Sequence, residues 1–160
     1  MSEVTEQQSV IRVREALARL GARGEVRALD DSARTAKEAA DALGIEVGQI
    51  ANSLVFMADG EAVLVMASGG HRVDTMAVAA VLEVSHVEKA TADQVRQATG
   101  FAIGGVAPLG FPAPIRTIVD TDLAQFDEVW AAGGHPHYVF PTSFDELVRI
   151  TGGTPADVGA

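Results

Sequence analysis

The sequence has no cysteine among its 160 residues. That absence excludes a disulfide scaffold, a thiolate nucleophile and cysteine-ligated zinc or iron–sulfur sites. It fits a reducing compartment. No apolar run approaches the roughly 18–20 residues of a membrane helix, and the first ten residues, MSEVTEQQSV, lack the basic start and apolar core of a signal peptide. We therefore expect a cytoplasmic protein with no membrane partner.

Positive charge is scarce and unevenly placed. Twelve Lys and Arg stand against 22 Asp and Glu, for a formal net charge of -10, so the surface as a whole repels polyanions. Residues 1–37 hold seven basic and six acidic residues, whereas residues 38–160 hold five and sixteen. We expect no DNA partner. Any RNA backbone would meet the N-terminal segment most easily, unless its arginines form only a solvated helix face.

The residues that are present suit one globular domain. Hydrophobic spacing and turn residues predict helices and strands in alternation but without a regular βαβ rhythm. Expected helices are residues 5–21, 36–43, 75–82, a segment that starts at the Thr91–Gln94 capping box and ends at Gly100, and a last one from the Ser143–Glu146 capping box to Gly152-Gly153. Expected strands are residues 50–58, 61–67, 84–88, 115–119, 128–132 and 138–140.

Local signals fix several of these boundaries. Asp59-Gly60 is typical of a type I′ hairpin turn, and Thr35 and Asp74 are expected helix caps. The mixture predicts an α+β fold with one domain and a mixed, largely antiparallel sheet flanked by helices. We divide it into an N-terminal helix (1–24), a main unit (25–152) and a tail (153–160) that should fray.

A stretch without charge lies between Arg96 and Arg116. Its central part, TGFAIGGVAPLGFPAP, contains too many glycines and prolines for a helix or a central strand, so it predicts a constrained loop against the core. The N–H groups of Gly104, Gly105 and Val106 can form a small anion-binding nest. The alternative is a rigid loop without a ligand. The spacing is neither GxGxxG nor a Walker loop, which disfavours nucleotide binding.

This loop resembles a known family motif. Gly104-Gly105-Val106-Ala107-Pro108 is similar to the GxxxP loop of the YbaK/prolyl-tRNA synthetase editing-domain superfamily. The segments IANSLVF, SGGHRVD and FDEVWAAGGHPHYVFPTSFDELVRITG follow the same order over residues 25–152. The resemblance implies a barrel-like mixed sheet flanked by helices. It also implies a trans-editing deacylase that hydrolyses the ester of mischarged tRNA.

The resemblance, with the chemistry of ester hydrolysis, gives the expected catalytic residues. Backbone donors at Gly104 and Gly105 would stabilise the oxyanion, and Val106 and Pro108 would line the aminoacyl pocket. Many family members carry a lysine where we align Asn52, and an amide can donate a hydrogen bond there but supplies no charge. The alternative for Asn52 is a polar residue on an exposed strand face.

Histidines give the remaining candidates. We expect His135, with Gly134 and His71, to contact the substrate; the alternative is surface histidines. A metal site could in principle use His135, His137 and His71 as ligands. An HxH pair is a weak signal, however, and we predict no metal and no cofactor. Asp74 is expected to cap a helix rather than act as a general base. Ser53 should point away from Asn52, because side chains alternate along a strand.

The sequence therefore predicts an aminoacyl-tRNA deacylase that acts in trans on tRNA(Pro)-type substrates by a non-covalent, substrate-assisted route. No GxSxG elbow or triad supports a covalent hydrolase. The expected partners are the acceptor end of mischarged tRNA and prolyl-tRNA synthetase, and the expected state is a monomer or weak homodimer. The alternative from another class is a catalytically silent module that binds a synthetase, a tRNA end or a small amino-acid-like ligand.

Overall fold

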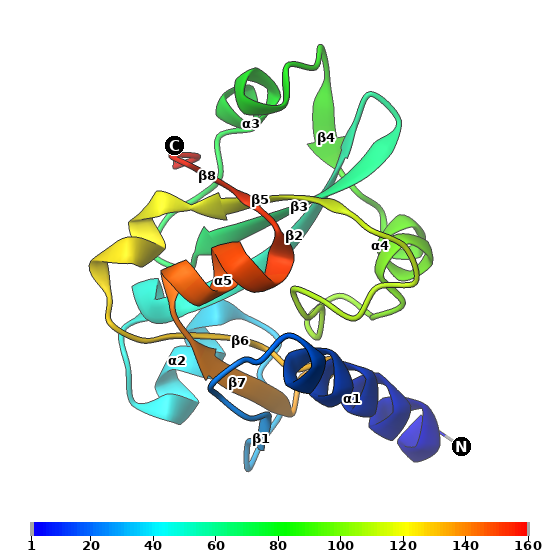
Figure 1. Cartoon of the computed structure of the whole chain (residues 1–160), viewed down its shortest axis with the longest axis vertical. Helices are drawn as coiled ribbons and strands as arrows, with labels where there is room; N and C mark the ends of the chain where they lie inside the picture. Colours follow the sequence, from blue (N-terminus) through cyan, green and yellow to red (C-terminus); the bar gives the residue numbers. More distant parts are fainter. Residues whose placement is uncertain (1, 160) are drawn as a thin grey trace.

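A computed structural model describes the backbone of residues 2–159 and the side chains of residues 8–159. Figure 1 shows α3 and β4 at one end of the molecule and α1 with β1 at the other. The helices are α1 (Ser2–Arg19), α2 (Ala36–Leu43), α3 (Thr75–Leu82), α4 (Ala92–Thr99) and α5 (Phe144–Thr151), with 3₁₀ turns η1 (Val47–Gln49) and η2 (Thr121–Gln125). The strands are β1 (Arg27–Ala28), β2 (Ile50–Ala58), β3 (Glu61–Ser68), β4 (Val87–Lys89), β5 (Arg116–Asp120), β6 (Val129–Ala132), β7 (Tyr138–Thr142) and β8 (Thr154–Ala156).

The strands form one mixed sheet in the order β1-β7-β6-β2-β3-β5-β8, with β4 added beside β2. Antiparallel pairing joins β1 to β7, β2 to β3, β2 to β4 and β6 to β7. Parallel pairing joins β2 to β6, β3 to β5 and β5 to β8. This arrangement confirms the predicted α+β fold with a mixed, largely antiparallel sheet.

The predicted caps and turn are present. Asp59 and Gly60 both have positive φ, 48° and 89°, as a type I′ turn requires. Thr35 accepts a hydrogen bond from the Glu38 N–H, and Asp74 accepts one from the Met76 N–H. Asp74 is therefore a helix cap, as predicted.

Three local predictions were wrong. Residues 84–86 form an irregular bend before β4 rather than part of the strand, because the Asp59 carboxylate accepts from the N–H groups of Ser85 and His86. The tail does not fray: β8 pairs with β5, and Val158 is fully buried. The second predicted capping box is half formed, because the Glu146 carboxylate instead accepts from Thr142 Oγ1 and the Arg23 N–H.

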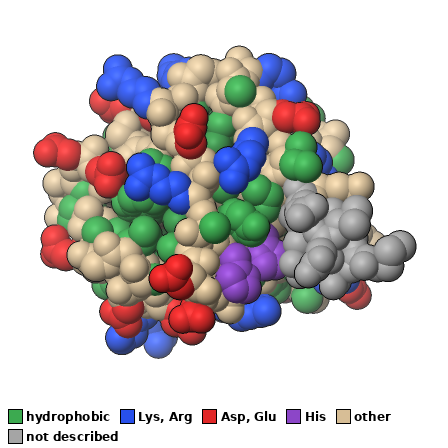
Figure 2. All heavy atoms as spheres, turned by 90° about the horizontal axis from the view of Figure 1, so that it is seen from below, with side chains coloured by type: hydrophobic (Ala, Val, Ile, Leu, Met, Phe, Trp, Pro, Cys, Tyr) green, Lys and Arg blue, Asp and Glu red, His purple; other side chains and the backbone are tan. Residues whose placement is uncertain are grey.

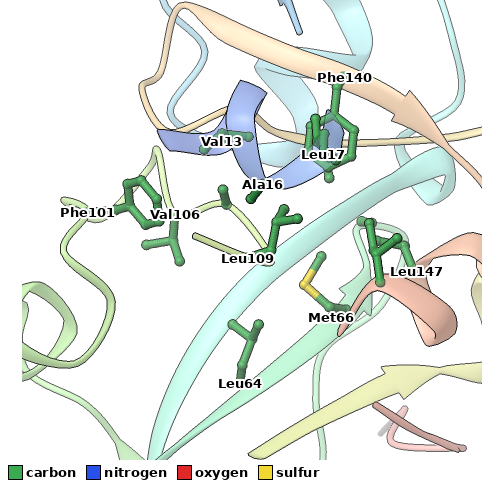
Figure 3. Close-up of a cluster of buried hydrophobic side chains, with 14 of the residues drawn as sticks. Val13, Ala16, Leu17, Leu64, Met66, Phe101, Val106, Leu109, Phe140 and Leu147 are labelled. Carbon is green, nitrogen blue, oxygen red and sulfur yellow. The ribbon is translucent and has the colours of Figure 1, made fainter. Parts of the chain in front are cut away.

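The core occupies both faces of the sheet. Along β2, Ala51 and Val55 face one cluster and Phe56 and Ala58 face another, as a strand's alternation requires. The larger cluster brings together side chains of α1, β3, the 101–109 loop, β7 and α5, shown in Figure 3. The other face is covered by α3, and a third cluster joins α2 to β2, β6 and β7. Within the described residues, no helix is both long and apolar enough to cross a membrane.

Candidate functional site

A gap in strand pairing creates the candidate site. One edge of β2 pairs with β6 at Ile50 and Ala51 and with β4 from Phe56 to Ala58. The Val55 carbonyl also accepts from the Ala90 N–H, which leaves residues 52–54 between the two partners. A pocket of about 170 Å³ lies there, bounded also by the 103–106 loop and the start of α2. We call it the gap pocket. Its lining comprises residues 33–36, Ala39, residues 50–54, Ile103, Gly104, Val106, residues 130–132, Tyr138 and Val139.

The uncharged loop is fixed against the core, as predicted. Phe101 and the run from Gly105 to Leu109 are buried, while Ile103 at the tip is 56% exposed. Phe101, Val106 and Leu109 belong to the same buried cluster as Val13 and Ala16 of α1, and Figure 3 shows Leu109 directly beside Ala16. Buried anchors on both sides of the tip therefore hold the residues that line the pocket.

Asn52 lies in the gap pocket rather than on an open strand face. Its side chain is half-buried, opposite Ala67 in the hairpin register, and makes no hydrogen bond within the described part of the chain. An amide carries two N–H donors and a carbonyl acceptor. These groups are left for water or a ligand.

The loop residues that line the pocket are not the predicted pair, Gly104 and Gly105. The Gly105 N–H donates to the Ala102 carbonyl at 3.0 Å, so its predicted use as an oxyanion donor does not fit this arrangement. Gly104 and Val106 line the pocket, and their N–H groups have no partner among the described residues. Gly104 has φ 95°, a left-handed conformation that side-chain-bearing residues rarely adopt.

Three other predicted residues lie outside the gap pocket. Pro108 is buried on the far side of the loop. His135 and Gly134 line a neighbouring groove. The His135 ring stacks on His137, and its centre lies 5.8 Å from the centre of the Tyr138 ring in an edge-on arrangement. Gly134 packs against α1, where an added Cβ would come within 2.9 Å of the Ser9 carbonyl oxygen.

His71 lies in a separate cluster at the end of β5. Its Nε2 is 2.5 Å from Asp120 Oδ2, and its Nδ1 is 2.8 Å from Asp122 Oδ2. Asp120 is fully buried and also accepts from the N–H groups of Ser68 and Asp122. We call these three residues the His71 cluster. Their ligand atoms are close enough to hold a metal ion, but both carboxylate oxygens of Asp120 already accept backbone hydrogen bonds within the fold.

The gap pocket has few groups for proton transfer. Among the described residues that line it, there is no Asp, Glu, His, Cys or Lys. Apolar walls from Ile50, Trp130 and Val139 surround the Asn52 amide and the loop N–H groups. This arrangement can bind a small acyl group and stabilise negative charge on its oxygen, but it holds no obvious general base.

Comparison with known proteins gives the family. The model of the aminoacyl-tRNA editing domain matches residues 30–150, which is most of the chain and includes the whole gap pocket. The chain belongs to the aminoacyl-tRNA editing domain family. The resemblance carried by the GxxxP loop is thereby confirmed.

Relatives of this editing domain include free-standing proteins and parts of larger enzymes. It is 43% identical, with a TM-score of 0.89, to a crystal structure of a protein proposed to be a trans-editing enzyme for prolyl tRNA synthetase, covering 95% of this chain and 97% of that one. It is 28% identical to the uncharacterized protein YwhH of Bacillus subtilis, over 79% of this chain and 81% of the relative. It is 35% identical to proline--tRNA ligase of Bacillus licheniformis, but over 56% of this chain and only 16% of the ligase.

Sequence reasoning missed some residues of the editing domain's pocket. The Ser53 hydroxyl points away from Asn52, as expected, and donates to Met66 Sδ in the larger core cluster. Ser53 nevertheless lines the pocket beside Asn52, so the two residues share one site, contrary to expectation. Arg34, Trp130 and Tyr138 also line it. No local motif marks them, because they come from three different elements that meet only after the sheet has formed.

Proposed function

We propose that this chain hydrolyses the ester bond of a mischarged aminoacyl-tRNA in trans, with the aminoacyl group in the gap pocket. The observation that carries this proposal is a set of polar groups at the pocket that have no partner in the described part of the chain: the Asn52 amide and the N–H groups of Gly104 and Val106. They are the groups that an ester carbonyl needs as it becomes an oxyanion.

The size and walls of the pocket support the same proposal. Its volume of about 170 Å³ is below the roughly 300–1,000 Å³ of pockets that bury whole drug-sized ligands. One aminoacyl group fits such a space, while the terminal nucleotide must lie outside. The apolar walls would contact the amino-acid side chain.

The reaction adds water to the ester carbonyl carbon, and the Asn52 amide and loop N–H groups hold the resulting oxyanion. The ester C–O bond then breaks, the ribose oxygen takes a proton, and the products are the free amino acid and tRNA with a free terminal hydroxyl. Because the pocket lining supplies no carboxylate or imidazole, we assign the proton transfer to the substrate's own neighbouring hydroxyl or amino group.

The similarity to proline--tRNA ligases and to the proposed trans-editing enzyme favours tRNA(Pro) as the RNA and prolyl-tRNA synthetase as a partner. The decisive experiment incubates the purified chain with tRNA(Pro) charged with Ala, Ser, Cys or Thr and measures released amino acid. We expect release above a buffer blank for at least one of them. Blank-level release for the whole panel would overturn the proposal.

The presence of Asn52, where many family members carry a lysine, supports one alternative: an editing-like module that is catalytically silent. Asn52→Lys tests it in the same assay. If the natural chain is inactive and Asn52→Lys hydrolyses the panel, the chain is a binding module whose chemistry was lost with that charge. If the natural chain is active, the amide itself suffices and the alternative is excluded.

A further inference from the structure

A groove beside the gap pocket has a different character. It encloses about 790 Å³ and is lined by α1, the residues before α2, α4, the 100–105 segment and the 134–136 turn. Three arginines from three of these segments contribute to it: Arg12, Arg34 and Arg96. We call it the arginine groove.

The charge of the arginine groove is opposite to that of the chain. No Asp or Glu belongs to its described lining, although the chain carries a net charge of -10. None of the three guanidinium groups forms an ion pair with a carboxylate in the part of the chain whose side chains are described. Three exposed guanidinium groups that have no counter-ion among the described side chains lie on one concave surface, and such a surface is a local site for a polyanion.

One of these arginines is already held in place. Arg12 Nη2 donates to the Gly100 carbonyl at 3.0 Å, and its guanidinium carbon lies 5.0 Å from the centre of the Phe101 ring. A guanidinium has five N–H donors, so most of them stay available while the group is positioned. That arrangement costs less side-chain entropy when an anion binds.

Apolar side chains accompany the charge. Ile11 and Ile103 are 48% and 56% exposed, and both line the groove. In Figure 2, histidine side chains border a patch of hydrophobic side chains that has lysine or arginine side chains on its other border. A single strand of RNA presents both phosphates and unstacked bases, and it therefore matches a groove that combines cations with apolar surface.

The groove leads into the gap pocket. Arg34 and Ile103 line both. Gly104 of the gap pocket lies beside Arg34, because an added Cβ on Gly104 would be 3.5 Å from Arg34 Cβ. A strand lying in the groove would thus place its terminal residue at the pocket entrance. The acyl group would enter where the Asn52 amide and loop N–H groups are.

We propose that the arginine groove binds the single-stranded 3′ end of the tRNA acceptor, with Arg12, Arg34 and Arg96 on its phosphates. This proposal rests on the proposed function for the identity of the RNA. It assigns the RNA contact to one surface made by α1, α4 and the chain before α2. The three arginines are binding and positioning residues and take no part in bond breaking.

The test measures binding of an uncharged RNA hairpin that copies the acceptor stem and ends in single-stranded CCA. A blunt hairpin of the same stem and free AMP are the control ligands. The full chain is compared with Arg12→Gln, Arg34→Gln, Arg96→Gln and Arg14→Gln by fluorescence anisotropy across a salt series. Arg14 is the matched control, because it is an exposed arginine on the same helix but two residues from Arg12, where side chains do not share a face.

We expect each groove variant to weaken binding of the CCA hairpin by roughly threefold to tenfold, and to reduce the slope of log K against log salt by about 0.7. Arg14→Gln should bind as the natural chain does, and the blunt hairpin and AMP should bind far more weakly. Equal binding by all variants, or equal affinity for AMP or the blunt hairpin, would overturn the proposal.

Deacylation separates this proposal from the proposed function. In an active chain, Arg12→Gln and Arg96→Gln should raise KM and leave kcat unchanged, the pattern of lost uniform binding. Arg34 also lines the gap pocket, so Arg34→Gln is compared by RNA affinity alone. Variants with unaltered KM and RNA affinity would refute the groove and leave the deacylase standing. An inactive chain that still loses RNA binding in the groove variants would refute the deacylase and leave the groove standing.

Discussion

The gap pocket and the His71 cluster both concentrate polar groups beside the sheet, but they differ in how those groups are satisfied. In the His71 cluster, both ring nitrogens of His71 face carboxylates, and Asp120 also accepts two backbone N–H groups. In the gap pocket, the Asn52 amide and two loop N–H groups have no partner among the described residues. Polar groups bonded to one another stabilise the fold, whereas partly buried groups without partners are available to a ligand.

The cause of the difference lies in strand pairing. At the cluster, β5 is flanked by β3 and β8, so loop residues close over a complete part of the sheet. At the pocket, β2 changes partner from β6 to β4 and leaves residues 52–54 open on one edge. The comparison predicts that changes at the cluster alter stability and that changes at the pocket alter activity.

Asp120→Ala should have the largest effect. It leaves the Ser68 and Asp122 N–H groups and the His71 ring without their shared acceptor, so the free energy of unfolding should fall by about 3 kcal/mol. Chemical denaturation measures it. Activity per folded molecule should be preserved; a fully stable variant with lost deacylation would place the cluster in the active site.

Gly104→Ala should act on catalysis. An alanine at φ 95° is strained by about 1–2 kcal/mol, and relief of that strain would shift the loop N–H groups. Because small displacements of catalytic groups cost about 10²-fold, we expect a loss of that order in kcat. The single-turnover rate of deacylation measures it. Gly60→Ala, strained in a remote turn, is the control and should keep its rate.

Asn52→Asp should reduce kcat by at least 10-fold with little change in stability. The two side chains have the same shape, but the carboxylate lacks the N–H donors of the amide and repels an oxyanion. If donation is the role, Asn52→Ala should be less impaired than Asn52→Asp. Equal rates for all three residues would remove Asn52 from the site.

The smallest effect is expected at the rim of the cluster. His71→Asn should lower the free energy of unfolding by about 1 kcal/mol, because Asp120 keeps its two backbone donors. Asp122→Ala should cost less, since its side chain is 44% exposed. Thermal unfolding ranks the two variants. A larger loss of stability for Asp122→Ala than for His71→Asn would contradict the account, because Asp122 is the more exposed of the two residues.

Local rules predicted much of the fold. The Thr35, Asp74 and Thr91 caps and the Asp59-Gly60 turn depend on neighbouring residues alone, and their elements appear where expected. The bend at residues 84–86 depends on Asp59, and strand β8 depends on its pairing with β5. Both partners are distant in sequence, so neither feature could be predicted from neighbouring residues.

The sequence pointed to two parts of the gap pocket, the 103–106 loop and Asn52, because both lie in segments that resemble the family. Their roles in catalysis stay predictions. The other features of the pocket could not be predicted from the sequence. Three features arise only from the folded arrangement. They are the gap in β2 pairing, the hydrogen bond from the Gly105 N–H, and the place of His71 in a cluster away from the pocket. Arg34 belongs to both the pocket and the groove without any local signal.

The most direct test of the difference between the two regions is NMR titration with a non-hydrolysable 3′-aminoacylamino-adenosine. The Asn52 side-chain amide and the backbone amides of Gly104 and Val106 should shift in a saturable way, while those of His71 and Asp120 should not move. Saturable shifts confined to the His71 cluster, or none in the gap pocket at a concentration that saturates binding, would contradict the assignment of the unpartnered groups to the ligand.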